Sequence, residues 1–167
     1  MMQISILIYL TAFVSIANAQ NHSTMTINQE APVFQTKSII INEKPEKIWR
    51  IISDVENWTK WNSKIKKVQI EEELKVESEF IWTSGGAKIT SKVHTFDSYK
   101  TLGWTGKTFG ARAIHNWHFE KVEGGTKITV EESMEGWLIS LMKKKMNIIL
   151  EEDLMFWLEQ LKIESEK

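Results

Sequence analysis

The hydrophobic period of the chain changes at Gly136, and this change limits the folds open to it. Between residues 73 and 134, apolar and polar side chains alternate along successive segments, which is the pattern of antiparallel strands with one buried face. From Trp137 to Glu164, apolar residues instead recur every three or four positions, as they do on one face of an α-helix. Gly136 separates the two patterns. This order predicts a sheet that precedes one long C-terminal helix.

The segment before the alternating region predicts one further strand and two short helices. Residues 33–42 are rich in β-branched side chains and predict the first strand. Pro45 suits the opening turn of a helix, and a second helical turn is predicted over Val55–Trp61 with Asp54 as its N-cap. The alternating stretches that follow are residues 74–82, 89–95, 102–106, 113–119 and 128–134.

Together these elements predict an α+β domain, because strands and helices are segregated along the chain. We expect a curved antiparallel sheet of six or seven strands that wraps around the long C-terminal helix, with two short helices after the first strand. No repeat or interdomain linker interrupts residues 33–167, so these residues are predicted to form a single domain. The space between the sheet and the final helix is then the natural place for a ligand cavity.

The N-terminal residues have a different composition from the rest of the chain. An apolar run from Ile4 to Ile16 ends in Ala17-Asn18-Ala19, which resembles a signal peptidase site. We therefore predict a signal peptide at residues 1–19 and a flexible segment at residues 20–32, in a protein that is secreted or periplasmic. After cleavage, no stable membrane insertion is expected. The alternative is a cytoplasmic protein that starts at Met25, since no Lys or Arg precedes the apolar run.

Charge and cysteine content remove several classes of function. The chain has 21 Lys and Arg against 22 Asp and Glu, so it lacks the basic excess of a nucleic-acid-binding protein. It has no cysteine, which excludes disulfides and thiolate zinc sites. His94 and His118 fall on the outward faces of their strands, where we expect them to be solvated. No metal site and no cofactor are predicted.

Several short motifs occur in an order that resembles a known superfamily. They are Pro45-x-x-x-Trp49, Asp54-x-x-x-Trp58-x-x-Trp61-Asn62, Gly125-Thr126 and Glu131-Glu132-Ser133-x-x-Gly136. With the order of elements, they resemble the START/Bet v 1-like (SRPBCC) superfamily over about Thr36–Leu161, and within it the polyketide cyclase/dehydrase and lipid-transport group. The resemblance implies a helix-grip fold with a deep hydrophobic pocket. It implies less about chemistry, because the same fold carries lipids, binds hormones or catalyses cyclisation.

One pair of polar side chains is predicted to face the interior. His115 shares a strand face with Trp117 and Phe119, and Glu132 shares one with Val130 and Met134. Across a hairpin that turns at Gly124-Gly125, positions 115 and 132 fall opposite or diagonal to each other. Such a pair is able to act as a general base with its orienting carboxylate. The alternative is that the two side chains satisfy each other and only make the pocket polar.

The alternation of inward and outward side chains along each strand, which we call its parity, also indicates the residues that are expected to line the cavity. Trp82, Trp104 and Trp117 recur on the inward face of three strands, and their rings offer a wall for a flat or long apolar ligand, unless they only pack the core. The predicted ligand-binding residues are Phe80, Trp82, Trp104, His115, Trp117, Glu132, Met134 and Met142.

Two classes of function fit this pattern. The first is a protein that binds or carries a small hydrophobic, lipid-like or polyketide-like ligand. The second is a cofactor-independent cyclase or dehydratase in which His115 and Glu132 are the catalytic acid–base pair. A cyclase usually needs several convergent polar groups, whereas this sequence offers one good pair, so we favour the binder. The sequence leaves the oligomeric state open.

Overall fold

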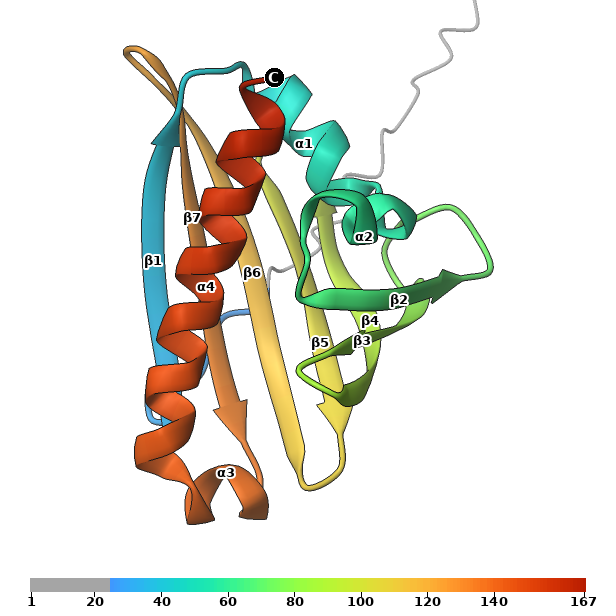
Figure 1. Ribbon diagram of the computed structural model, residues 1–167, viewed down its shortest axis with the longest axis vertical. Coiled ribbons are helices and arrows are strands. Elements are labelled where there is room, and N and C mark those ends of the chain that lie inside the picture. The colour runs from blue at the N-terminus through green and yellow to red at the C-terminus, as the bar shows by residue number, and fades with distance from the viewer. Residues whose placement is uncertain (1–24) are drawn as a thin grey trace, which may run out of the picture.

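The computed structural model describes residues 25–167, so the predicted signal peptide lies outside the described residues. Its sheet has seven antiparallel strands in the order β1-β7-β6-β5-β4-β3-β2 (Figure 1). The strands are β1 (Val33–Ile41), β2 (Ile65–Ile70), β3 (Glu79–Ser84), β4 (Ala87–Asp97), β5 (Thr101–Thr108), β6 (Ala111–Val122) and β7 (Gly125–Glu135). Strands β2 to β7 form a meander, and β1 pairs with β7 at its edge.

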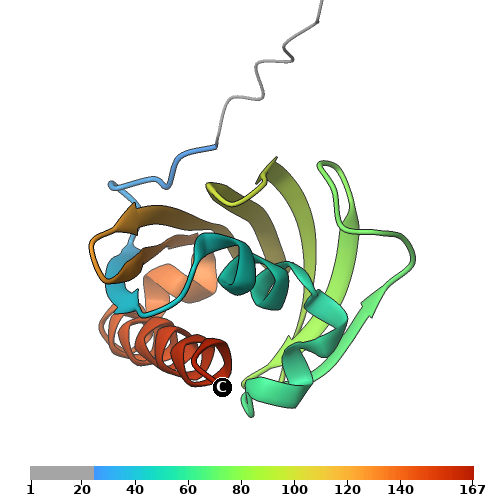
Figure 2. The ribbon, with the colours of Figure 1, turned by 90° about the horizontal axis from the view of Figure 1, so that it is seen from above.

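Helices lie on one face of this sheet, which curves around them (Figure 2). They are α1 (Pro45–Ser53), the 3₁₀-helix η1 (Val55–Asn57), α2 (Trp58–Trp61), α3 (Trp137–Leu141) and α4 (Lys143–Ser165). Helix α4 packs against β1, and its buried stripe includes Leu150, Leu154, Trp157, Leu158 and Leu161. The predicted helix-grip architecture is therefore confirmed.

The C-terminal helix differs from the prediction because it is broken near its start. Met142 separates α3 from α4 with φ −108° and ψ 21°, which lie outside the helical range. The backbone N–H of Leu138 donates to the carbonyl of Gly110 over 3.2 Å, so the hairpin between β5 and β6 holds the first turn of α3. We attribute the break to this anchorage, since helical periodicity carries no information about a contact with a distant hairpin.

The start of the meander also differs from the alternating pattern. Residues 74–82 were predicted as one strand, but residues 71–78 form a loop, and β3 starts only at Glu79. Ser78 explains this turn, because its hydroxyl accepts from the N–H of Lys75 and donates to the carbonyl of Glu73. Glu77 adopts φ 74°, in the left-handed region. Strand β2, over Ile65–Ile70, was not predicted from the sequence.

Residues 25–32 belong to the segment that was predicted as flexible, and they contact the convex side of the sheet. The side-chain amide of Asn116 donates to the carbonyl of Met25 over 2.9 Å. The backbone N–H of Asn28 donates to the Ser133 hydroxyl over 3.0 Å, and Ala31 is buried. The described chain therefore enters the fold across the outer face of β6 and β7.

Candidate functional site

His115 and Glu132 lie directly opposite each other on the paired strands β6 and β7. Their side chains point to the concave face, and His115 Nδ1 is 2.5 Å from the Glu132 carboxylate. Only 7% of the histidine side chain and 15% of the glutamate side chain are exposed. An ionised carboxylate only accepts hydrogen bonds, so this contact assigns the neutral imidazole the tautomer with its proton on Nδ1. The second nitrogen, Nε2, is left as an acceptor in the neutral ring.

Nε2 of His115 has no partner within residues 25–167, although it is buried. The imidazole stacks on Trp104 with ring centroids 4.6 Å apart and planes 11° from parallel. The indole N–H of the neighbouring Trp117 is also buried and unpartnered in this part of the chain. Buried polar atoms are normally paired by protein, water or ligand. An acceptor and a donor are thus offered side by side on the concave face of β6.

The predicted lining residues fall into two groups. Phe80, Trp82, Trp104 and Trp117 are nearly or fully buried on the concave face, as their parity predicts. Met134 is partly buried against the same core, whereas Met142 lies at the break between α3 and α4. The structure thus joins the four aromatic residues with His115 and Glu132, and it places Met142 at the end of the grip.

Two tryptophans that were not predicted as lining residues stand at the centre of this aromatic group. Trp58 contacts the rings of Phe80, Trp82 and Trp104 at centroid distances of 5.7, 5.7 and 5.5 Å. Trp157 of α4 contacts both Trp58 and Trp117, at 5.0 and 5.9 Å. The helical stripe identified Trp157 as buried, but no sequence signal indicates which rings will meet. The interior of the grip is occupied by interlocking aromatic rings.

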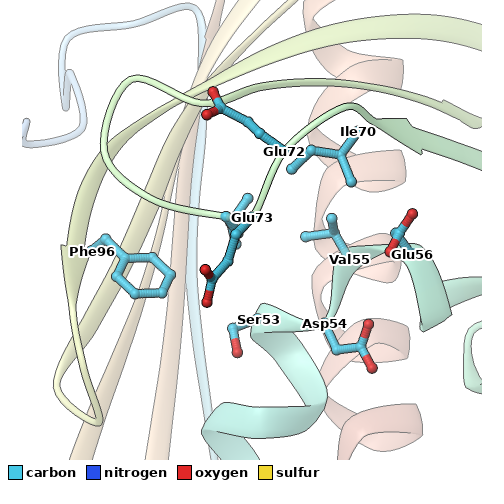
Figure 3. Close-up of a pocket in the computed structure, with 9 residues that line it drawn as sticks. Ser53, Asp54, Val55, Glu56, Ile70, Glu72, Glu73 and Phe96 are labelled. Carbon is cyan, nitrogen blue, oxygen red and sulfur yellow. The ribbon is translucent and has the colours of Figure 1, made fainter.

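Two cavities outside this aromatic group are resolved in the described structure. The larger, about 250 Å³, lies between the α1–η1 turn and the loop from β2 to β3 (Figure 3). Its lining combines apolar side chains with carboxylates: Ser53, Asp54, Val55, Glu56, Ile70, Glu72, Glu73, Leu74 and Phe96. The second, about 210 Å³, lies on the convex side beside Met25 and Arg112. Neither is lined by any of the eight predicted ligand-binding residues.

His94 does not lie in solvent as the alternation of its strand predicted. Burial lowers the pKa of His94 to about 4, and its Nδ1 is 2.9 Å from the Thr95 hydroxyl. The cause is a shift in register between Val93 and Thr95, together with the missing side chain of Gly103. A Cβ atom at Gly103 would lie 2.5 Å from both the His94 ring and the Asn116 side chain. His118, by contrast, is 38% exposed and lies 3.3 Å from Glu131.

The described residues hold neither a metal cluster nor a membrane span. No group of three or more His, Asp or Glu side chains is placed to hold a metal ion within residues 25–167. Over the same range, no helix has the length and apolar character needed to cross a membrane.

Comparisons with known proteins identify the relatives of this fold. The family model described as polyketide cyclase/dehydrase and lipid transport matches residues 35–164. A hypothetical protein of Helicobacter pylori superposes with a TM-score of 0.75 and 19% identity, covering 94% of this chain and 99% of that one. The ZhuI aromatase/cyclase of Streptomyces superposes with a TM-score of 0.70 and 12% identity, covering 80% of this chain and 93% of that one. A START superfamily protein of Mycobacterium smegmatis superposes with a TM-score of 0.69 and 16% identity, covering 80% of this chain and 97% of that one.

At these identities the structural likeness establishes the fold alone. A search of curated protein sequences returned no match.

Proposed function

Because the chain belongs to the polyketide cyclase/dehydrase and lipid-transport family, we propose that it binds a small hydrophobic molecule inside the grip, with His115 as the polar anchor. One observation carries this proposal, namely the buried Nε2 of His115 that has no partner in the described chain while Glu132 holds Nδ1. An unpaired buried acceptor costs free energy, and a ligand hydroxyl that donates to Nε2 removes this cost.

The surrounding rings favour one class of molecule. Trp104 and Trp117 flank the imidazole, so the ligand meets flat aromatic surfaces on both sides of the polar group. Aromatic rings favour offset-stacked or edge-to-face partners. A flat, polycyclic, phenol-bearing molecule therefore fits the anchor better than an unbranched acyl chain does.

Entry of such a ligand requires the aromatic interior to rearrange. Trp157 is the only α4 residue in ring contact with Trp58, Trp61, Trp82 and Trp117 among the described residues. A change in the rotamer of this one side chain, or a small displacement of α4, therefore opens space next to Trp117. We propose that the bound state arises in this way.

Calorimetric titration of the protein with 1,8-dihydroxyanthraquinone and with oleic acid tests the proposal. We expect tighter binding of the anthraquinone, and a loss of roughly 5- to 150-fold in its affinity for His115→Ala, as a hydrogen bond of about 1–3 kcal/mol is removed. His118→Ala, on the opposite face of the same strand, is the matched control and should bind like the wild type. Failure of the wild type to bind either molecule, or equal affinities of the two variants, would refute the proposal.

A second candidate function is acid–base catalysis by the same pair. The hydrogen bond from Nδ1 to Glu132 orients the ring and leaves Nε2 as a base, which is the arrangement that proton abstraction next to a carbonyl requires. Glu132→Gln separates the two functions. Glutamine still accepts from Nδ1–H, so a binder should keep its affinity within about threefold. An enzyme that cyclises a poly-β-ketone should instead lose about 10²- to 10⁴-fold in turnover.

A further inference from the structure

Three large apolar side chains project into solvent at one end of the molecule, and we call them the apolar tip. Phe109 in the β5–β6 turn is 79% exposed, and Trp137 and Leu141 of α3 are 59% and 76% exposed. The rings of Phe109 and Trp137 meet edge to face with centroids 5.5 Å apart. Figure 1 shows α3 and the β5–β6 turn at the same end of the grip.

The apolar tip is held in place by the fold. Gly110 follows Phe109, and a Cβ atom there would lie 2.9 Å from the indole of Trp137, so the turn and the helix are in close contact. The hydrogen bond from Leu138 to the Gly110 carbonyl joins the same two segments. The exposed rings are therefore presented by two anchored elements, and their exposure is a property of the folded state.

Three consecutive lysines lie directly beside the apolar tip. Lys143, Lys144 and Lys145 form the first turn of α4 and are all exposed. None of them makes a salt bridge with another described residue. The sequence carries no Asp or Glu between Gly136 and Leu150. This end of the molecule thus combines protruding apolar groups with uncompensated positive charge.

Helix stability does not account for these lysines. The N-terminus of a helix carries partial positive charge, so cations in its first turn are unfavourable. Met142 supplies no side-chain cap to offset this effect. Exposed tryptophan, phenylalanine and leucine likewise reduce solubility without adding to the core. Both features oppose the folded, dissolved state, which indicates that another surface covers them.

We propose that the apolar tip and the lysine triplet dock the protein onto an anionic lipid bilayer. Tryptophan is enriched at membrane–water interfaces, and basic residues next to apolar ones are typical of proteins that lie on anionic membranes. A few side chains that protrude from a turn and a short helix suit shallow insertion between headgroups. Three exposed apolar residues are far fewer than the roughly 20–30 residues a side that a stable protein interface uses. This inference is independent of the ligand proposed above.

Trp137 reports on this docking directly. The other seven tryptophans of the chain are each at most 9% exposed, whereas Trp137 is 59% exposed. The full chain is mixed with vesicles of phosphatidylcholine, with or without phosphatidylglycerol, and with brominated phosphatidylcholine as quencher. We expect a blue shift and quenching of the Trp137 emission only when phosphatidylglycerol is present, and loss of both signals in Trp137→Phe.

Two sets of variants test the contribution of charge. The triple replacement of residues 143–145 by glutamine should lower vesicle affinity about a hundredfold, since each lysine contributes about fivefold near an anionic surface. Replacement of the exposed Lys44, Lys60 and Lys67 by glutamine removes the same charge elsewhere and should have little effect. Residues 1–24 are common to all variants, so the differences report on the apolar tip and the lysines alone.

Three results would overturn the proposal. The first is that Trp137 emission is unaffected by brominated lipid although the protein sediments with the vesicles. The second is equal vesicle affinity of the two lysine variants. The third is that the wild type does not bind vesicles but self-associates without lipid, and that the double variant Phe109→Ser, Leu141→Ser abolishes this self-association. The apolar tip would then be an interface between copies of the chain.

Discussion

The histidines of strands β4 and β6 show how much one residue's surroundings alter its chemistry. His115 on β6 is oriented by a carboxylate and offers its second nitrogen to the concave face. His94 on β4 lies on the other side of the sheet, beside Gly103 and Asn116, and its Nε2 is buried without a partner in the described chain. The ring of His115 is held by the Glu132 carboxylate, whereas the ring of His94 has only the Thr95 hydroxyl as a side-chain hydrogen-bond partner among the described residues.

Burial of His94 predicts a specific dependence of stability on pH. Its pKa is about 4 in the folded protein and near 6.5 in the unfolded chain. Between these values the unfolded chain binds more protons, so the free energy of unfolding falls as the pH drops from 6.5 to 4. Removing the titrating ring in His94→Gln should flatten this fall by about 1–2 kcal/mol, after allowance for screening by solvent that reaches the ring.

Urea denaturation at several pH values measures this difference between wild type and variant. His118→Gln, which replaces a more exposed ring on the neighbouring part of the sheet, is the matched control for the loss of a histidine. If the curve of His94→Gln stays parallel to that of the wild type between pH 6.5 and 4, the ring is not protected from protonation in the way that its burial implies.

Residue-scale features were predictable where strand alternation is regular. The parity of β6 and β7 was enough to place His115 and Glu132 on one face, because the hairpin that joins these strands has no register shift. The same reasoning failed for His94, because the register shift in β4 and the space left by Gly103 change its surroundings. Such a shift leaves no mark on the hydrophobic pattern.

At the scale of elements, α4 is the part that closes the grip. Leu158 is fully buried, whereas Ile163 on the same helix is 57% exposed. The ion pairs of Lys37 with Glu151 and of Lys64 with Asp153 join α4 to β1 and to the residue before β2. These exposed pairs contribute little to stability, so packing of the apolar stripe must hold the helix.

We therefore expect Leu158→Ala to lower the free energy of unfolding by about 2–5 kcal/mol, because it leaves a cavity beneath α4. Ile163→Ala changes a comparable side chain on the exposed side and should stay within about 0.5 kcal/mol of the wild type. Chemical denaturation measures both. Equal, small losses in the two variants would show that α4 does not pack on the sheet as described.

Element boundaries were predictable to the extent that local sequence determines them. The Pro45 helix, the first strand and the final hairpin follow from turn residues and β-branched runs. The break at Met142 and the loop at residues 71–78 do not, since α3 is anchored to Gly110 through Leu138 and the loop is held by the hydroxyl of Ser78. Both are contacts that hydrophobic periodicity does not report.

At the scale of the whole molecule, the sequence predicted a sheet curved around the C-terminal helix, but it did not predict how side chains pack between the two. The pattern placed the aromatic residues correctly on the concave face. It did not indicate that Trp58 and Trp157 would meet there and contact Trp104 and Trp117, the two rings that flank His115. The shape of an interior depends on side-chain rotamers and on how closely α4 approaches the sheet, which hydrophobic periodicity does not determine.

The proposal that the interior of the fold binds a small hydrophobic molecule through His115 has a direct test. Native mass spectrometry is applied to the wild type, His115→Ala and Glu132→Gln, each expressed in and purified from the protein's own source. We expect a bound small molecule on the wild type that Glu132→Gln retains and His115→Ala loses. A wild-type protein that carries no such molecule, or one that His115→Ala retains to the same extent, would contradict it.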